Sequence, residues 1–227
     1  VWIVFEPLMY LGAIGYGRGS FVDVIDGKTF LEFFFPGLLV STAMMVPFFE
    51  GTYANFTKLT HQKIYTSILL TPVSPEEIVY GEIMWCATKG FFGVCGVLMV
   101  SSLFGLINTW LVLPALLVLF LVSWLFSCLA MVVTSLARNY DSFVYATSGF
   151  IIPMSLIAGT YFPVSHMPKA LQILAYCLPL THGVSLVRAL LSENFENIHY
   201  LNLAYLLILS WLTMNLAIKR IRQKLIS

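Results

Sequence analysis

The amino-acid sequence predicts an all-α integral membrane protein, and three observations support this fold class. Of its 227 residues, 59% are hydrophobic and only 10% are charged, whereas about 25% of the residues are charged in an ordinary soluble domain. No Asp, Glu, Lys or Arg occurs in the 48 residues Gly90–Ala137, and one spanning helix needs about 20 apolar residues. The composition excludes a disordered chain, a collagen-like fibre and a small disulfide-rich protein, and it disfavours a soluble enzyme.

Hydropathy divides the chain into six predicted transmembrane helices within a single domain, residues 1–227. Their approximate ranges are Trp2–Gly17, Phe33–Asn55, Pro75–Ser102, Leu111–Ala137, Ser142–Tyr161 and Tyr200–Ile218. Because the chain begins with Val1 inside the first apolar segment, we expect that a short native N-terminus is missing.

Basic residues in the loops predict the orientation, because Lys and Arg are enriched in cytosolic loops. One set of loops contains seven basic residues: Lys58, Lys63, Arg138, Lys219, Arg220, Arg222 and Lys224. The other set contains four: Arg18, Lys28, Lys169 and Arg188. The sequence therefore predicts that both termini lie in the cytosol.

The segment Ala170–Val187 contains no charged residue, but Pro179 interrupts it. As a seventh span it would place the basic C-terminal tail outside the cell. A segment of this length with a central proline is better interpreted as an outer re-entrant or interfacial helix pair before the last span.

The connection between the second and third spans is the most polar part of the predicted cytosolic face. Its residues Thr57–Thr66 mix polar and apolar side chains in a pattern compatible with a short amphipathic helix, which Pro72 would end. Ser74-Pro75-Glu76-Glu77 then favours a helix start, with Ser at the N-cap and Glu three residues later. A compact cytosolic element is therefore followed directly by a spanning helix.

Glu50 and Lys89 lie inside the predicted bilayer on consecutive antiparallel spans. At about 1.5 Å per residue, both lie roughly 10 Å from the cytosolic edge. Uncompensated charge at this depth is costly, so we predict that the two side chains form an intramembrane ion pair. Separate snorkelling to the interface is the alternative, and substrate or proton coupling is a third possibility.

Motifs for catalysis and nucleotide binding are absent from the sequence. There is no P-loop, no HExxH and no GxSxG motif. The four histidines, His61, His166, His182 and His199, lie in loops, and the cysteines show no metal-ligand spacing. We predict no catalytic residue, metal or cofactor in this chain. The net charge of +1 argues neither way about nucleic acid, and we expect no such partner.

Several short motifs accompany the six spans: Glu50–Phe56, Gly81–Lys89, Met131–Ala137, Tyr140–Phe143, Pro153-Met154, Ala158-Gly159, Phe162-Pro163, Met167-Pro168 and Pro179–Arg188. With the polar element and the re-entrant pair, they resemble the permeases of ABC-2 type transporters over nearly the whole chain. Within that family the chain is most similar to the permeases that export lipo-chitooligosaccharide nodulation factors.

The resemblance implies a permease homodimer in the bacterial inner membrane, docked on two copies of a separate ATPase subunit that binds ATP and Mg²⁺. It also implies that Thr57–Thr66 is the coupling helix, which contacts the ATPase. The expected contact residues are Phe56, Lys58, Leu59, His61, Gln62, Lys63, Ile64 and Tyr65. The alternative is an amphipathic helix on the lipid surface.

The implied function is outward export of a lipid-linked or amphipathic substrate, such as a glycolipid or lipooligosaccharide. Multidrug or antibiotic export is the alternative. The residues expected to shape the outer exit are Phe162, Pro163, Pro168, Pro179, His182 and Arg188. Arg188 either meets lipid phosphate or anionic cargo near headgroup level, or bonds to nearby carbonyl groups.

Three other classes compete with this interpretation. A secondary transporter would normally show two related halves, and the sequence shows no internal repeat. A membrane-embedded transferase needs clustered carboxylates or histidines, which are scattered here. A purely structural membrane subunit is compatible with the sequence.

Overall fold

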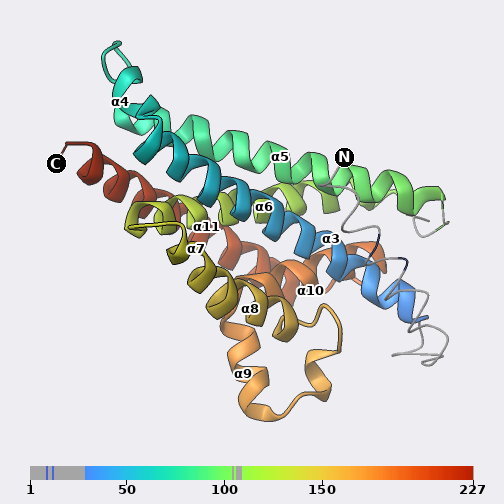
Figure 1. Ribbon diagram of the computed structural model, residues 1–227. Coiled ribbons are helices and arrows are strands. Elements are labelled where there is room, and N and C mark those ends of the chain that lie inside the picture. Colours follow the sequence, from blue (N-terminus) through green and yellow to red (C-terminus); the bar gives the residue numbers. More distant parts are fainter. Residues whose placement is uncertain (1–8, 10–11, 13–28, 104, 106–108, 227) are drawn as a thin grey trace.

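The computed structural model describes residues 9, 12, 29–103, 105 and 109–226, and over these residues it contains helices and no strand (Figure 1). Four helices are long and apolar enough to cross a membrane: Phe30–His61, Pro75–Ser102, Val112–Leu136 and Ile198–Leu225. They correspond to the second, third, fourth and sixth predicted spans. The first predicted span, Trp2–Gly17, lies outside the described residues.

The first of these long helices begins at a capping box, three residues before the predicted start. The Glu32 main-chain N–H donates to Thr29 Oγ1, and the Glu32 carboxylate accepts a bond from the Thr29 N–H at 3.0 Å. This pair of bonds satisfies donors that a helix start otherwise leaves free. Helix α3 (Phe30–Phe49) therefore begins at Phe30.

Two prolines and two wide turns shape the rest of the first long helix. Pro36 and Pro47 lie inside α3, and the π-helical turns η2 (Glu50–Ala54) and η3 (Thr57–His61) extend it. A proline removes a main-chain donor, and local π-helical adjustments compensate for this in membrane helices. The helix consequently continues past Asn55, where the prediction ended it.

Helix α5 (Pro75–Leu103) begins as predicted. The Ser74 N–H donates to Glu77 Oε2 at 2.7 Å, and the Glu77 N–H donates to Ser74 Oγ at 3.3 Å. Halfway along α5, Gly90 permits close packing, because a Cβ atom there would lie 2.8 Å from Pro47 of α3. Small residues allow such close approach between membrane helices.

Shorter helices lie between α6 (Val112–Leu136) and α11 (Ile198–Ile226). The fifth predicted span corresponds to α7 (Asp141–Ala146), η4 (Thr147–Ile151) and α8 (Ile152–Ile157). These run continuously for about 25 Å at 1.5 Å per residue, short of the roughly 30 Å of hydrocarbon in a bilayer.

The predicted break at Pro179 is confirmed: α9 (Lys169–Cys177) and α10 (Pro179–Leu191) meet at an angle of 88°. The predicted total of six spans is not confirmed. Within the described residues there are four spans, or five if the bent pair α9–α10 crosses as one.

The hydrophobic core lies where α3, α5, α6, α10 and α11 pack together, with α6 in contact with the other four. Figure 1 shows α4 (Ile64–Ile68) and the C-terminal end of α11 at the same end of the bundle. We call this the basic end, because it gathers Lys58, Lys63, Arg138 and the basic residues of Lys219–Lys224. The start of α3, together with the bent pair α9–α10, lies toward the opposite end, which we call the far end.

Candidate functional site

A protruding segment of the basic end runs from the last residue of η3 to the residues before α5 and contains α4. We call this segment, residues 61–73, the tip. Figure 1 shows it standing beyond the ends of α3 and α5, with α4 inside it. The Leu70 side chain is 87% exposed, and Ile64 and Val73 are exposed as well. The tip therefore offers apolar side chains among polar ones, as a docking surface does.

The prediction of one amphipathic helix over Thr57–Thr66 is wrong. Thr57–His61 continues the long helix of α3, and α4 begins only at Ile64. Between them, Lys63 has φ 50° and ψ 29°, a left-handed conformation that residues with a Cβ atom rarely adopt. The chain therefore breaks and turns at Lys63.

Four of the eight expected contact residues do not face outward. Phe56 is only 2% exposed and Tyr65 is fully buried. Leu59 packs against a buried cluster formed by α5, α6 and α11, and Lys58 is bound by Glu82. The exposed members of the set are His61, Gln62, Lys63 and Ile64.

Leu70 and Val73 are exposed residues of the tip that the sequence reasoning missed. Ile68-Leu69-Leu70 lies in the predicted connection between the second and third spans, but the expected contact residues ended at Tyr65. The available signal was Thr71-Pro72, because residues of this kind mark a turn. The turn follows α4 directly and leaves Leu70 on its outer side.

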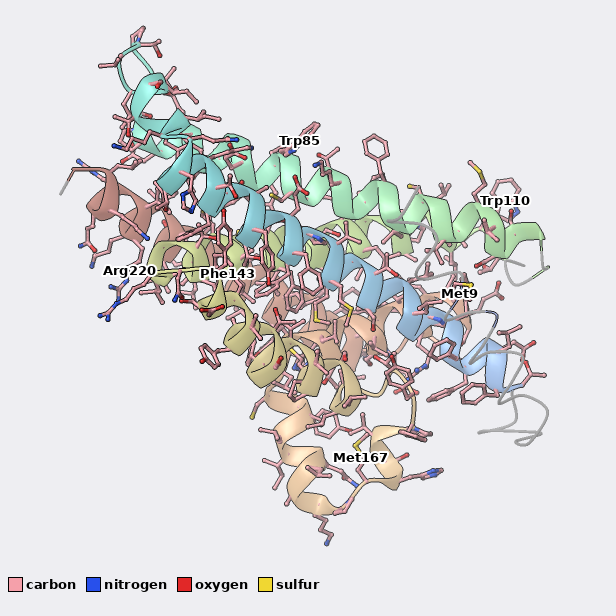
Figure 2. The ribbon with its side chains drawn as sticks, viewed as in Figure 1. Met9, Trp85, Trp110, Phe143, Met167 and Arg220 are labelled. Carbon is pink, nitrogen blue, oxygen red and sulfur yellow. The ribbon has the colours of Figure 1, made fainter. Side chains whose placement is uncertain are left out.

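An aromatic cluster connects the tip to α7. The His61 and Tyr140 rings stack with centroids 5.5 Å apart, and the Tyr140 hydroxyl lies 2.8 Å from Thr57 Oγ1. Phe56 and Phe143 meet edge to face at 5.3 Å, with Phe143 fully buried within the bundle (Figure 2). The aromatic cluster therefore joins the tip and the first long helix to α7.

The C-terminal end of α11 is hydrogen-bonded to the C-terminal end of α6. Lys224 Nζ donates to the main-chain oxygens of Thr134 and Ala137, at 3.3 and 3.0 Å. It also lies 5.8 Å from the Phe56 ring centroid. A cation is favourable at a helix C-terminus, where carbonyl groups lack partners.

Two ion pairs join the first long helix to α5. Lys58 Nζ donates to both oxygens of the Glu82 carboxylate, at 2.7 and 2.9 Å. The structure also brings Lys89 and Glu50 together, with 2.5 Å between Nζ and Oε1. The Lys89 ammonium lies 5.1 Å from the Trp85 ring centroid, and Trp85 points away from the bundle in Figure 2.

Tyr65 anchors the tip beside the first of these pairs. It is the buried residue of α4. Burial, and after it the negative charge of Glu82, raises the pKa of Tyr65 above its ordinary value. The hydroxyl is therefore protonated at physiological pH, and Tyr65 is an uncharged, buried side chain of α4 near Glu82.

At the far end, Arg188 of α10 joins three segments of the chain. Its Nη2 atom donates to Phe33 O at 3.2 Å and to Gly159 O at 2.9 Å. The guanidinium carbon also lies 4.0 Å from the Phe33 ring centroid. Of the two expected arrangements for Arg188, the structure has the carbonyl-bonded one.

Residues of α11 form hydrogen bonds with the bend between α9 and α10. His182 Nδ1 lies 2.8 Å from Asn202 Oδ1, and His182 Nε2 lies 3.0 Å from Tyr176 O. The Tyr205 hydroxyl donates to Cys177 O at 2.8 Å. These bonds satisfy carbonyl groups at the end of α9, where the helix leaves them without partners.

The three prolines that were expected to shape the outer exit lie at or just before helix starts, where proline is favoured. Pro163 precedes η5 (Val164–His166), Pro168 precedes α9 and Pro179 begins α10. Phe162 is exposed beside them. Of the six expected outer residues, Pro163 and Arg188 line a cleft of ≈ 410 Å³.

The ABC-2 type transporter family matches residues 1–192 of this chain. The chain belongs to this family. It is therefore a multi-pass transport permease, of a class that works with an ATPase partner. Helix α11 follows the matched range and packs against α6 and α10.

Three relatives illustrate the similarity of this ABC-2 transporter to known proteins. It is 31% identical to "Nodulation protein J" of Sinorhizobium fredii over 222 residues, 98% of this chain and 85% of that protein. It is 35% identical to "Nodulation protein J" of Rhizobium meliloti over 186 residues, covering 82% and 71%. Identity to the "Inner membrane transport permease YadH" of Escherichia coli is 24% over 190 residues, covering 80% and 71%. No solved structure matches the chain.

Proposed function

We propose that this chain is the permease subunit of an ATP-driven exporter and that its tip docks on a separate ATPase subunit. The observation that carries the proposal is the exposed tip, which passes directly into a spanning helix on each side. The first long helix ends at His61, and α5 begins at the Ser74 cap. Because no flexible linker intervenes, a force on the tip acts on both spans.

The proposed orientation places the basic end in the cytosol. Lys and Arg are enriched on the cytosolic side of membrane proteins, and seven basic residues of this chain gather at that end. The bent pair α9–α10 is then an outer re-entrant element, and both termini lie in the cytosol. Membership of the family and the name of the Escherichia coli relative support an inner-membrane location.

The proposed cargo is a lipid-linked or amphipathic molecule of the glycolipid or lipooligosaccharide class, exported between two copies of the permease that carry two ATPase subunits. Similarity to several proteins named "Nodulation protein J" supports this class. The apolar outer surface of α5, where Trp85, Phe92 and Met99 are exposed, is compatible with a lipid-tailed cargo.

The docking proposal is tested by Leu70→Asp in the full chain, expressed with its neighbouring genes and affinity-purified. We expect the co-purified ATPase to be lost, because a charge replaces the most exposed apolar side chain of the tip. The matched control is Leu136→Asp, an exposed leucine at the end of α6. It should retain the ATPase.

Two results would contradict the docking proposal. One is retention of the ATPase by Leu70→Asp. The other is the absence of any ATPase from the unsubstituted, correctly inserted chain. Membrane insertion and a single peak in size-exclusion chromatography are required of each variant before its partners are compared.

A further inference from the structure

The two ion pairs between the first long helix and α5 form a ladder with a defined order of charges. From the basic end inward, the first helix carries Lys58 and then Glu50, and α5 carries Glu82 and then Lys89. The rungs are about 11 Å apart at 1.5 Å per residue. Each cation faces an anion, and the polarity of the second rung is opposite to that of the first.

This reversed order permits one register between the two helices. A slide by one rung would bring Lys58 against Lys89, or Glu50 against Glu82, and like charges repel strongly in partly buried surroundings. A smaller slide would break both rungs. It would leave four charges without partners, although the side chains of Lys58 and Glu82 are only 28% and 14% exposed.

Aromatic residues place the ladder in contact with the tip. Tyr65 of α4 is buried beside the first rung, where the Glu82 charge acts on its hydroxyl. Trp85 lies between the rungs on α5, next to Lys89, and lines a groove of ≈ 440 Å³ together with Lys58 and Glu82. Ile68 of α4 lines the same groove, so α4 lies against the first rung.

We propose that Lys58, Glu82, Glu50 and Lys89 are positioning residues for transport. They hold the first long helix and α5 in one register, so that a push on the tip moves the two spans as one body. That an ATPase supplies this push rests on the proposed function. The register itself is a property of the permease alone and can be measured without the ATPase.

The register is tested by electron–electron distance measurement on the full chain in nanodiscs, with the native cysteines replaced by alanine. Spin labels at Phe49→Cys and Met99→Cys, both exposed positions, report movement along the helix axes. The unsubstituted ladder should give one narrow distance. The double variant Glu50→Gln with Glu82→Gln breaks both rungs and should add a second population displaced by about one helical turn, ~5 Å.

Three further variants separate register from general damage. Lys58→Arg keeps the charge pair and should give the single distance. The fourfold swap Glu50→Lys, Lys58→Glu, Glu82→Lys and Lys89→Glu keeps the reversed order and should restore it. Glu77→Gln, which changes a capping carboxylate outside the ladder, should leave the distance unchanged. The same single distance in the double variant Glu50→Gln with Glu82→Gln would overturn the proposal, and so would two populations in the fourfold swap.

The transport part is tested by adding ATP to the complex with the co-purified ATPase. ATP should leave the Phe49–Met99 distance unchanged in the unsubstituted permease and should shift it in the double variant Glu50→Gln with Glu82→Gln, which still binds the ATPase because its tip is intact. An ATP-dependent shift in the unsubstituted complex would overturn movement as one body. If no ATPase co-purifies, the proposed function fails, whereas the register measurement still decides the ladder.

Discussion

The two ends of the bundle differ in the described ion pairs that join their helices. Toward the basic end, ammonium and carboxylate groups pair between helices, and Phe56 meets Tyr140 edge to face. Bonds from side chains to main-chain oxygens occur at both ends, from Lys224 at the basic end and from Arg188 and Tyr205 at the far end. The three ion pairs within the described residues all lie between the middle of α5 and the basic end.

Ion pairs and bonds to main-chain oxygens differ in how strictly they select a partner. A charge pair is specific for its partner and leaves buried charge when it breaks, so it fixes one helix against another. A carbonyl group is present at every residue, so a side chain that donates to one can exchange it for the next. The two ion pairs therefore fix the register of the first long helix against α5.

The largest predicted effect is at the aromatic cluster of the basic end. Phe56→Ala should lower the free energy of unfolding by about 3 kcal/mol, because it leaves a cavity around a buried aromatic site. Thermal unfolding of the purified chain measures the effect. Phe49→Ala, at a position of the same long helix that is 40% exposed, should cost much less. Equal losses of unfolding free energy in the two variants would contradict a special contribution of the buried Phe56 ring.

At the far end, Arg188→Ala should lower the free energy of unfolding by about 2 kcal/mol, because it removes charge-assisted bonds to two carbonyl groups. Arg188→Gln can still donate one such bond and should recover part of the loss. Lys169→Ala, at an exposed position at the start of α9, is the control and should have little effect. If Arg188→Gln is as unstable as Arg188→Ala, the positive charge matters more than the hydrogen bonds.

The smallest predicted effect concerns the bend between α9 and α10. Tyr205→Phe removes the bond to Cys177 O and should cost about 1 kcal/mol. Hydrogen exchange should become faster in Tyr176–Leu180, whereas the aromatic cluster of the basic end should be unaffected. Tyr200→Phe, at an exposed position of the same helix, provides the comparison. Faster exchange at both ends would contradict independent behaviour of the two regions.

The sequence located features that depend on composition or on proline. Four of the six predicted apolar ranges correspond to long helices. Pro179 predicted the bend, because a proline lacks the donor that a continuous helix needs. Glu50 and Lys89 were placed at matching depth simply by counting residues along two antiparallel helices. The structure brings the two side chains together.

The sequence did not locate features that depend on local backbone geometry. The left-handed conformation of Lys63 has no signature in a lysine, so the break between η3 and α4 was missed. Because the first long helix was expected to end at Asn55, Lys58 was assigned to a surface loop, whereas it faces Glu82. Phe56 was assigned to a docking surface for the same reason, although the continued helix directs it inward.

The central claim, that the tip docks on an ATPase, is tested most directly by site-specific photo-crosslinking in living cells. A benzoylphenylalanine residue in place of Leu70 should form an adduct with a protein that contains a P-loop. The same probe in place of Leu136 should not form this adduct. Adducts of the Leu70 probe with lipid alone, or the same protein adduct at both positions, would contradict the account.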